Sequence, residues 1–290
     1  FMAIPMMGEY AGAILRVDLE KGKTERFTLD EAILRKFIGG TGLGAKFLYD
    51  EVPQGTEWFD PRNKLILAVG PLNATPIGGS GSISVVTKGP LTNGASCSQA
   101  NGYFGAYLRL CGLNGIIIQG AAKNPKYLYV DSKSAELKDA EWLAGTDTYK
   151  TADLVKHEHD CKEREMAVAS IGPAGENLVK FAGVFIDYGH SASHNGPGAV
   201  MGSKKLKAIA IAREGNQVAV RDIKRIQKIS RKLIENVRTL SKGTYEYGTL
   251  NGLHANLERG NMIPVKNYMT SSWVIDPEKW RKFSGQYIRE

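Results

Sequence analysis

One order of predicted elements occurs twice in the chain, and this repetition restricts the possible folds more than any other feature. Each copy contains a strand, a Gly-Pro pair, a second strand, a polar loop, a short helix that begins with Gly-Ala, and an isoleucine-rich strand. The two copies cover residues 64–118 and 166–211. A duplicated unit brings the two polar loops together near a pseudo-twofold axis. The alternative is that turns between strands and helices look alike in unrelated segments.

The polar loop of the first copy belongs to the stretch from Gly89 to Gly120, GPLTNGASCSQANGYFGAYLRLCGLNGIIIQG. Its side-chain donors and acceptors are those of Ser96, Ser98, Gln99 and Asn101. Gly102 and Gly105 allow a close backbone approach. The loop therefore suits a bulky polar ligand, and two helix N-termini aimed at one place would favour a phosphate or another anion. The alternative is an ordinary structural loop.

Length and charge limit the function classes. The chain has 290 residues, enough for one large domain or two ordinary ones. Its net charge of +8 permits an anionic ligand, but the Lys and Arg residues are scattered, so no nucleic-acid partner is expected. No apolar run approaches the roughly 18 residues of a membrane-spanning helix, so no membrane partner is expected. The first residues, FMAIPMMGEY, lack the basic start and long apolar stretch of a signal peptide.

The cysteines argue against a metal centre built by this chain alone. Cys97, Cys111 and Cys161 form no C-x-x-C pair, so the iron–sulfur and zinc signatures are missing. A sparse, odd set favours a reducing, cytoplasmic compartment. Cys111 is expected in the core, and Cys97 as a packed thiol rather than a nucleophile. The H-x-H-x-C pattern that begins at His157 could suggest a metal, but its charged neighbours favour a solvated helix end.

Two further segments bear on domain organisation. The glycines in residues 39–52, GGTGLGAKFLYDEV, resemble a dinucleotide fingerprint only superficially, because the spacing G-G-x-G-x-G is wrong and a helix precedes it. From Arg221 onward, isoleucine, leucine and valine recur at helical spacing among basic residues, which favours a helix with a solvated face over a phosphate-binding surface. We predict an α+β domain at residues 8–212 and the beginning of an α-helical domain at residues 213–290.

Seven separate stretches resemble the aldehyde ferredoxin oxidoreductases: KLILAVGPL, SVVTKGPLT, GYFGAYL, ASIGPAGENLVKFA, GAVMGSKKLKAIAI, YGT and IPVKNY. They follow the order and spacing of that family, from about Gly12 to the end of the chain. The resemblance implies an N-terminal α+β domain of two similar β-rich halves, followed by part of a helical region. It also implies a bis-pyranopterin cofactor carrying tungsten or molybdenum, with a magnesium ion between its phosphates. An aldehyde substrate, ferredoxin as electron acceptor, a homodimer and a cytoplasmic location follow from the same resemblance.

Position by position, the resemblance implies cofactor-binding residues in both polar loops. They are Ser82, Gln99, Ala100, Asn101 and Gly102 in the first half and His190, Ser191, Ala192 and Ser193 in the second. The backbone carbonyls of Gln99 and Ser191 would help to hold the magnesium. Ser82 and His190 stand where the family has arginines, so two charge-assisted contacts of roughly 1.5–3 kcal/mol each are lost. Lys88 or His194 could supply replacement charge.

The resemblance also implies a four-iron four-sulfur cluster, held by a C-x-x-C-x-x-x-C run that this sequence does not contain. The chain as given is therefore not expected to be active alone, and no catalytic residue is assigned. Glu176 and Asn177 are expected to brace the second loop rather than to catalyse. Three functions stay open: the cofactor-binding part of an aldehyde:ferredoxin oxidoreductase, a non-catalytic pterin-binding or scaffold module, and a related tungsten-dependent reductase of another electrophile, such as an aromatic thioester. The substituted arginines and the absent cysteines favour the second.

Overall fold

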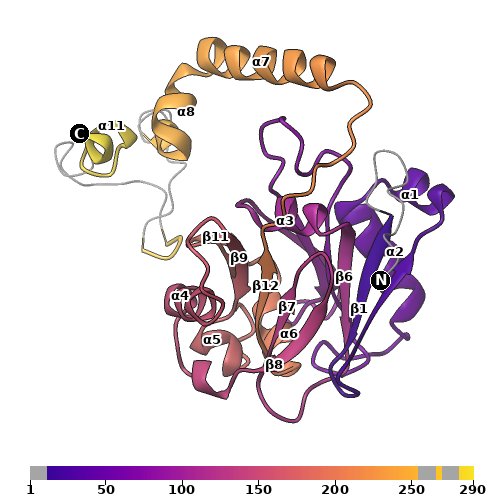
Figure 1. Ribbon diagram of the computed structural model, residues 1–290. Coiled ribbons are helices and arrows are strands. Elements are labelled where there is room, and N and C mark those ends of the chain that lie inside the picture. Colours follow the sequence, from indigo (N-terminus) through magenta and orange to yellow (C-terminus); the bar gives the residue numbers. More distant parts are fainter. Residues whose placement is uncertain (1–11, 254–265, 270–280) are drawn as a thin grey trace. The chain divides into compact units, whose positions relative to one another are not determined.

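A computed structural model of the protein describes residues 12–253, 266–269 and 281–290 (Figure 1). These residues belong to two compact units that divide between Ile223 and Lys224. The last strand of the first unit ends at Ala212, and residues 213–222, all of them described, contain neither helix nor strand. The predicted domain boundary after residue 212 stays a prediction.

The first half of the first unit forms a six-stranded sheet in the order β2-β1-β6-β3-β4-β5. Its strands are β1 Ala13–Asp18, β2 Lys23–Thr28, β3 Leu65–Ala68, β4 Ile83–Lys88, β5 Ala95–Ala100 and β6 Leu113–Gln119. Only β1 and β6 are parallel; the other neighbours are antiparallel. Ile116, Ile117 and Ile118 in β6 are fully buried on alternating faces, which explains why this strand reads as a continuous apolar run.

The second half forms a second six-stranded sheet, in the order β8-β7-β12-β9-β10-β11 when read from the β8 edge. Its strands are β7 Lys126–Val130, β8 Ala135–Asp139, β9 Met166–Ser170, β10 Val184–Ile186, β11 His190–Ala192 and β12 Leu206–Ala212. Each strand occupies the place of its counterpart in the first sheet, and again only one pair, β7 and β12, is parallel. The predicted α+β fold of two similar β-rich halves is therefore confirmed.

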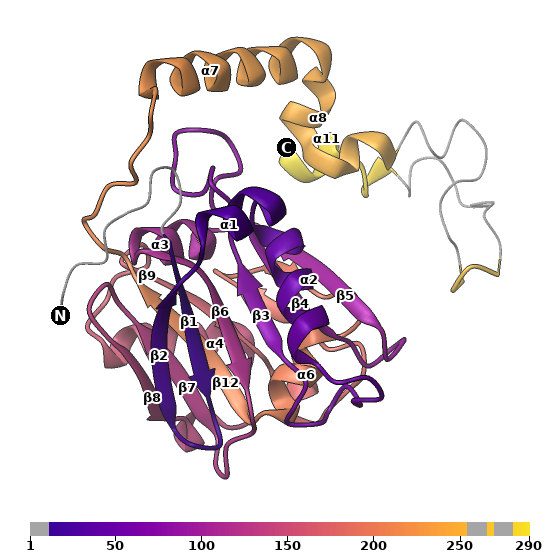
Figure 2. The same cartoon turned by 90° about the vertical axis from the view of Figure 1, so that its right-hand side faces the viewer.

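The two sheets pack face to face, and the side chains between them form the largest core. Helices α1 and α2 cover the outer face of the first sheet, as Figure 2 shows. Helix α4, with the short helix η1, covers the outer face of the second sheet. The bounds are α1 Glu31–Phe37, α2 Gly40–Glu51, η1 Glu141–Leu143, α4 Thr148–Glu158 and α5 Pro173–Glu176.

Each half contains one short helix that contacts both sheets. Helix α3 (Phe104–Leu110) contacts β6 of its own sheet and β9 and β12 of the second sheet. Helix α6 (Pro197–Ser203) contacts β10 and β12 of its own sheet and β3 and β4 of the first. They lie at opposite ends of the first unit (Figures 1 and 2). The two halves are thus related by an approximate twofold axis.

The repeated Gly-Ala pair has a packing role at the start of these helices. The amide of Gly105 donates to the oxygen of Gly81 at 3.0 Å, and the amide of Gly198 donates to the oxygen of Ala182 at 2.8 Å. A Cβ atom on Gly105 would lie 2.2 Å from a backbone oxygen just before β4, and one on Gly198 would lie 2.3 Å from a backbone oxygen just before β10. Only glycine permits this approach in either half.

The structure differs from the sequence prediction where apolar periodicity is weak. Residues 95–100, predicted as a loop, form β5, and residues 190–192 of the second predicted loop form β11. Both are edge strands of small and polar residues, so neither shows the apolar alternation of a half-buried strand. In the second copy, the apolar residues 178–186 predict one strand after the Gly-Pro pair, but only Val184–Ile186 form it, as β10. The glycine-rich residues 39–52, for which no element is predicted, contain helix α2.

The second unit contains helices in its described part: α7 Ile223–Leu240, α8 Lys242–Tyr247, η2 Gly248–Leu250 and α11 Gly285–Arg289. The predicted helix after Arg221 is confirmed, and its apolar side chains Ile229, Leu233 and Val237 remain 43–48% exposed. The sequence also predicts a loop at residues 244–250 and a helix at residues 250–259. The loop residues are helical instead, and most of the predicted helix lies outside the described residues. In the described ranges, no helix combines the length and the apolar character needed to cross a membrane.

Candidate functional site

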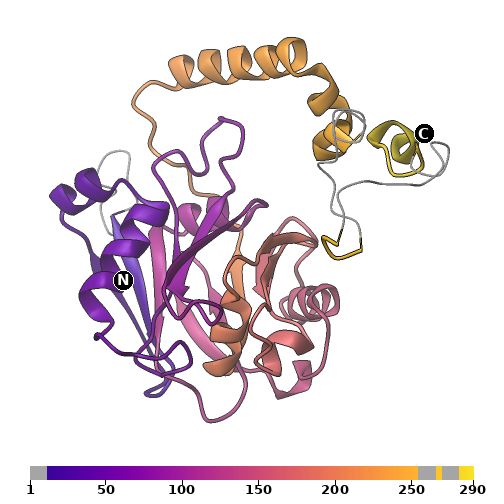
Figure 3. The ribbon, with the colours of Figure 1, turned by 180° about the vertical axis from the view of Figure 1, so that it is seen from behind.

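The edge strands β5 and β11, which carry most of the predicted cofactor-binding residues, lie against each other in the first unit. Figure 3 shows this side of the unit, where the purple strands of the first half meet the rose strands of the second. The two strands run past each other in opposite directions. A Cβ atom on Gly102, after β5, would lie 3.1 Å from Cδ2 of His190 at the start of β11. At the other end, the amide of Thr92 donates to Oδ1 of Asn195 at 3.1 Å.

The first-half candidates gather on one exposed surface. Gln99 and Asn101 are exposed, whereas Ala100 between them faces the core because side chains alternate along a strand. The Ser82 hydroxyl lies 2.8 Å from Oδ1 of Asn101. The Gln99 amide nitrogen lies 3.5 Å from Oγ1 of Thr41 in the first turn of α2. Ser82, Gln99 and Asn101 therefore lie on the same side of the sheet edge.

The second-half candidates follow this alternation only from Ser191 to Ser193, because His190, at the first position of β11, is exposed although it shares the strand face of Ala192. His190, Ser191 and Ser193 are exposed, and Ala192 is fully buried. The strand is held by antiparallel pairing with β10, in which Phe185 lies opposite Ser191. The structure thus brings the exposed candidates of both halves to adjacent strands, with the small residues of each strand turned inward.

Hydrogen bonds between the halves fix the two strands relative to each other. The amide of His194 donates to Oγ of Ser98, a buried side chain, at 3.0 Å. The amide of Tyr103 donates to Oδ2 of Asp187 at 2.6 Å. These bonds join residues that are 96 and 84 positions apart in the chain. The strands therefore form one surface rather than two independent loops.

Asp187 is a residue of this region that the sequence did not reveal. Its carboxylate also accepts from the amide of Val168 at 3.3 Å, so it connects β9 with the start of α3. Burial raises the pKa of Asp187, while the amide of Tyr103 and the ammonium of Lys156 act in the opposite direction. The only local signal is the Asp-Tyr-Gly sequence, which is typical of a hairpin turn.

The exposed surface along β5 and β11 has a chemistry that fits an anionic ligand rich in acceptors. Residues 95–106 and 188–196 contain no Asp or Glu. The exposed side chains at the surface are amides, hydroxyls and two imidazoles, all able to donate hydrogen bonds. As edge strands, β5 and β11 also offer backbone groups that their own sheets leave unpaired. The ammonium of Lys88 donates to the carbonyl of Thr56, so one of its three donors is used within the protein.

The prediction that two helix N-termini aim at an anion is wrong. The amides at the start of α3, Tyr103 and Phe104, bond to Asp187. In α6, Pro197 has no N–H group, and the amide of Gly198 bonds to a backbone oxygen. The first amides of both helices are thus used inside the protein.

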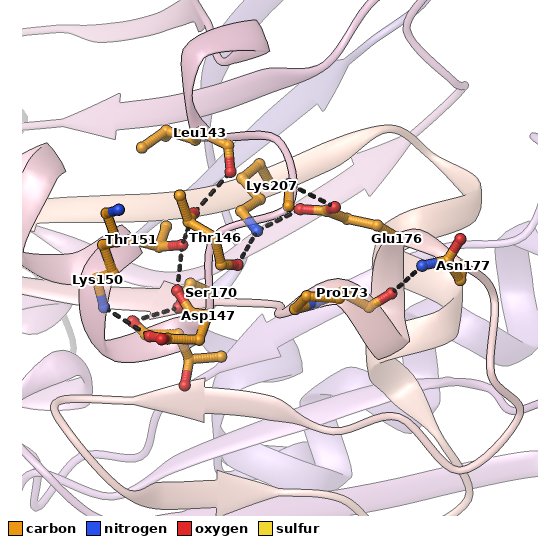
Figure 4. A network of polar contacts seen from close by, with 12 residues as sticks. Leu143, Thr146, Asp147, Lys150, Thr151, Ser170, Pro173, Glu176, Asn177 and Lys207 are labelled. Carbon is orange, nitrogen blue, oxygen red and sulfur yellow. Dashed lines mark hydrogen bonds and ion pairs between the residues drawn. The ribbon is translucent and has the colours of Figure 1, made fainter.

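Residues 173–177, with the sequence PAGEN, have a structural role, as Figure 4 shows. Oε2 of Glu176 accepts from the amide of Gly145 at 2.9 Å, and Oε1 pairs with the buried ammonium of Lys207. Lys207 also donates to the oxygen of Thr146 at 2.8 Å. Asn177 donates to the oxygen of Pro173 at 2.8 Å. Glu176 and Asn177 therefore fix the segment that follows β9, which agrees with a bracing role.

The cysteine and histidine candidates also serve packing. Cys111 is buried, and burial raises its pKa to about 12. The Cys97 thiol lies 2.9 Å from Oγ1 of Thr41, beside a hollow of about 570 Å³ between α2 and β5. The predicted solvated helix end is correct for exposed His157 but wrong for His159, which stacks on Tyr129 with ring centroids 4.2 Å apart at the end of α4.

Comparison with known proteins gives the family. The family described as "Aldehyde ferredoxin oxidoreductase, N-terminal domain" matches residues 14–213. The chain belongs to this family. It is 38% identical over 264 residues to the tungsten-containing aldehyde ferredoxin oxidoreductase of Pyrococcus horikoshii, an alignment that covers 90% of this chain and 43% of that protein. The chain thus spans less than half the length of this curated relative.

Two other relatives carry different descriptions. The chain is 34% identical over 275 residues to the "Aliphatic sulfonate oxidoreductase, WOR-like subunit" of Pyrococcus furiosus, with 90% of this chain and 44% of that protein covered. Among solved structures, the BamBC active-site complex of benzoyl-coenzyme A reductase, in complex with 1,5-dienoyl-CoA, matches with a TM-score of 0.77. It is 34% identical and covers 81% of this chain and 35% of that chain.

Proposed function

We propose that this chain is the cofactor-binding part of a tungsten-dependent, or molybdenum-dependent, pterin oxidoreductase that oxidises aldehydes to carboxylic acids and passes electrons to ferredoxin. The observation that supports this most is the surface of amide, hydroxyl and imidazole side chains along β5 and β11 in a domain of this family. The relatives described as tungsten-containing aldehyde ferredoxin oxidoreductases support the metal and the reaction class. A homodimer in the cytoplasm is part of the same proposal.

The residues of the two strands have separate roles in this proposal. The backbone carbonyls of Gln99 and Ser191 would help to hold a magnesium ion that neutralises the phosphates of the cofactor. The side chains of Asn101 and His190 donate to the pterin or its phosphates. The small or hydroxyl-bearing residues that complete the cofactor-binding set are Ser82, Ala100, Gly102, Ala192 and Ser193.

When bound, the metal-pterin group supplies the two-electron chemistry at the substrate carbon. The chain itself binds and orients that group through hydrogen bonds from β5 and β11. Ala100 and Ala192 are buried in the core between the sheets, so they would contact the group only through their backbone. A four-iron four-sulfur cluster is proposed only for a longer chain or a second chain, since this sequence has no C-x-x-C pair.

A related reductase is the second candidate, and two observations favour it. The similar solved structure belongs to a benzoyl-coenzyme A reductase, and one relative is described as a sulfonate oxidoreductase subunit. Ser82 and His190 also replace two arginines that the resemblance implies, so the cofactor environment is less cationic. This candidate keeps the same cofactor-binding role for the chain but changes the electrophile, for instance to an aromatic thioester.

Metal and pterin analysis tests the proposal. We expect the protein, purified without added metal from cells supplied with tungstate and molybdate, to contain pterin with tungsten or molybdenum near one metal per polypeptide. Absence of both metals and of pterin would contradict the oxidoreductase proposal and leave a scaffold module. Dye-linked oxidation of an aldehyde panel, against reduction of aromatic thioesters, then separates the two candidate reactions.

A paired substitution tests the role of His190. We expect H190R to raise pterin-metal occupancy by about tenfold when loading is limiting, because a guanidinium donates stronger charge-assisted bonds than an imidazole. H194R is the matched control, since His194 is exposed on the same surface four positions further on. Equal gains from both variants would show that only net charge matters and would contradict the assignment of His190.

A further inference from the structure

We propose that Asp187 is a positioning residue that sets the spacing between the two candidate cofactor-binding strands. This inference rests on the proposed function for its consequence, but its structural part can be measured without the cofactor. Asp187 is half-buried, and we infer that it acts on the exposed surface through its neighbours Gly102 and His190.

The carboxylate of Asp187 connects three elements at once. Oδ2 accepts from the amide of Tyr103 at 2.6 Å, directly before α3 in the first half. Oδ1 accepts from the amide of Val168 at 3.3 Å, within β9 of the second half. Asp187 directly follows Ile186, the last residue of β10, and begins the turn into β11. Both oxygens are engaged by backbone groups, which makes the contact independent of flexible side chains.

The turn that Asp187 opens has an unusual backbone. Asp187, Tyr188 and Gly189 have φ values of +43°, +57° and +128°, and β11 begins with the next residue, His190. Non-glycine residues rarely adopt positive φ, although Asp and Asn tolerate it better than most. The hydrogen bonds of the carboxylate therefore offset a strained turn whose geometry decides where His190 lies.

Gly102 shows how tightly the two loops fit around this carboxylate. A Cβ atom on Gly102 would lie 2.7 Å from Oδ2 of Asp187 and 3.1 Å from Cδ2 of His190. Gly102 itself has a φ of +104°, which glycine adopts readily. The first polar loop, the carboxylate and the imidazole thus share one contact, and moving one of them moves the others.

The groups around Asp187 support its charge without replacing its bonds. The ammonium of Lys156, a buried residue, lies 4.3 Å from the centroid of the Tyr188 ring and donates to the oxygen of Glu163 at 3.0 Å. Asp153 accepts from the hydroxyl of Tyr188 at 2.5 Å. Asp153, a residue of α4, is thus a nearby carboxylate that binds the same turn but does not join the two halves.

Amide hydrogen exchange of the metal-free protein tests this positioning role. D187G removes the carboxylate but permits positive φ, so backbone strain does not contribute; D187N keeps the shape and removes the charge. We expect the Tyr103 amide to exchange about tenfold faster, or more, in D187G, and residues 188–194 to gain exchange with it, because a bond to a charged acceptor is lost. D187N should fall between D187G and the native protein, while the amides of β6 keep their native rates. D153N, the matched control, should leave the Tyr103 amide unchanged.

The consequence for the cofactor is measured separately. We expect D187G to lose pterin-metal occupancy by a larger factor than D153N at equal melting temperature. An unchanged Tyr103 amide in D187G would overturn the positioning role, as would a uniform rise over all strands, and should D187G not fold, D187N decides by the same amide rates. A native protein without pterin would contradict the proposed function, yet the exchange rates would still decide the role of Asp187.

Discussion

The two halves of the first unit share a topology but are joined to each other by different chemistry. In both, a hairpin turn of one half packs against the residues before a helix of the other. At one crossing, the carboxylate of Asp187 accepts from the amide of Tyr103. At the other, the neutral carboxamide of Asn195 accepts from the amide of Thr92 and donates to its hydroxyl at 2.8 Å. The crossing next to His190 is thus the charged one.

A second difference concerns the residue that directly follows α3 in the first half and α6 in the second. Lys204, six positions after Gly198, is 1% exposed and donates to the oxygen of Asn63 at 2.6 Å and to that of Gly120 at 3.2 Å. The corresponding residue of the first half is Cys111, whose thiol lies 3.6 Å from the oxygen of Ala212. Both side chains reach the end of the equivalent strand in the other half. Backbone packing is therefore common to the halves, whereas the polar groups that join them are specific to each.

The largest expected effect concerns what the halves share. G105A and G198A should each lower the free energy of unfolding by about 3 kcal/mol, because the added methyl meets a backbone oxygen that cannot move away easily. Urea unfolding measures both. G78A is the matched control, since nothing lies within 4 Å of a Cβ atom there, and it should change stability by less than about 0.5 kcal/mol. If only one of the two variants lowered the free energy of unfolding, the two glycines would not have equivalent packing roles.

The next effect concerns the buried lysine. At pH 9, K204M should lower the free energy of unfolding by about 2 kcal/mol, because the carbonyls of Asn63 and Gly120 lose their donor. K205M is the control, since Lys205 is exposed on the adjacent position. C111A in the first half should cost about 1 kcal/mol. If C111A proved more costly than K204M, the lysine would not be the stronger of the two contacts.

The same lysine gives a pH dependence with a defined sign. Burial lowers the pKa of Lys204 to about 7, from 10.5 in the unfolded chain. Between these values the unfolded chain holds one more proton, so the contribution to the unfolding free energy rises with pH, by at most about 1.4 kcal/mol per unit. The stability gap between the native protein and K204M should therefore widen from pH 7 to pH 9. A gap that narrows over this range would contradict the lowered pKa.

The smallest effect concerns the neutral crossing. N195A should cost about 1 kcal/mol, because two neutral hydrogen bonds to Thr92 are lost. It should leave the exchange rate of the Tyr103 amide unchanged. The double variant N195A/T92A should have a free energy of unfolding within about 0.5 kcal/mol of that of N195A, because both substitutions remove the same hydrogen bonds. Faster exchange at Tyr103 in N195A would show that the two crossings are coupled.

Sequence predicts the buried part of this fold well and its edges poorly. Strands such as β3 and β6 are buried on both faces, so their apolar runs mark them, and the Gly-Ala repeat reveals the duplication. Strands β5 and β11 have exposed polar faces and short pairing, which leaves a loop-like pattern. Helix α2 begins with closely spaced glycines, which have low helix propensity, and packing on the first sheet overrides that preference.

The sequence likewise predicts only part of the candidate site. Gln99, Asn101 and Gly102 stand out as polar or glycine residues of the first loop, but the role of the whole set as cofactor ligands rests on the family resemblance and stays a prediction. Asp187 and Asn195 were missed because their partners are 84 and 103 positions away in the chain. The bond from Lys88 to Thr56 is likewise a tertiary contact that no local pattern encodes.

The most direct test of the central claim is anomalous diffraction at the tungsten edge from crystals of the loaded protein, or at the molybdenum edge if that metal is present. The account predicts one strong peak per chain over the exposed surface of β5 and β11. The peak should lie close enough to Gln99 and Ser191 for both residues to bind the cofactor that carries the metal. A peak elsewhere on the chain, or pterin bound away from these strands, would contradict it.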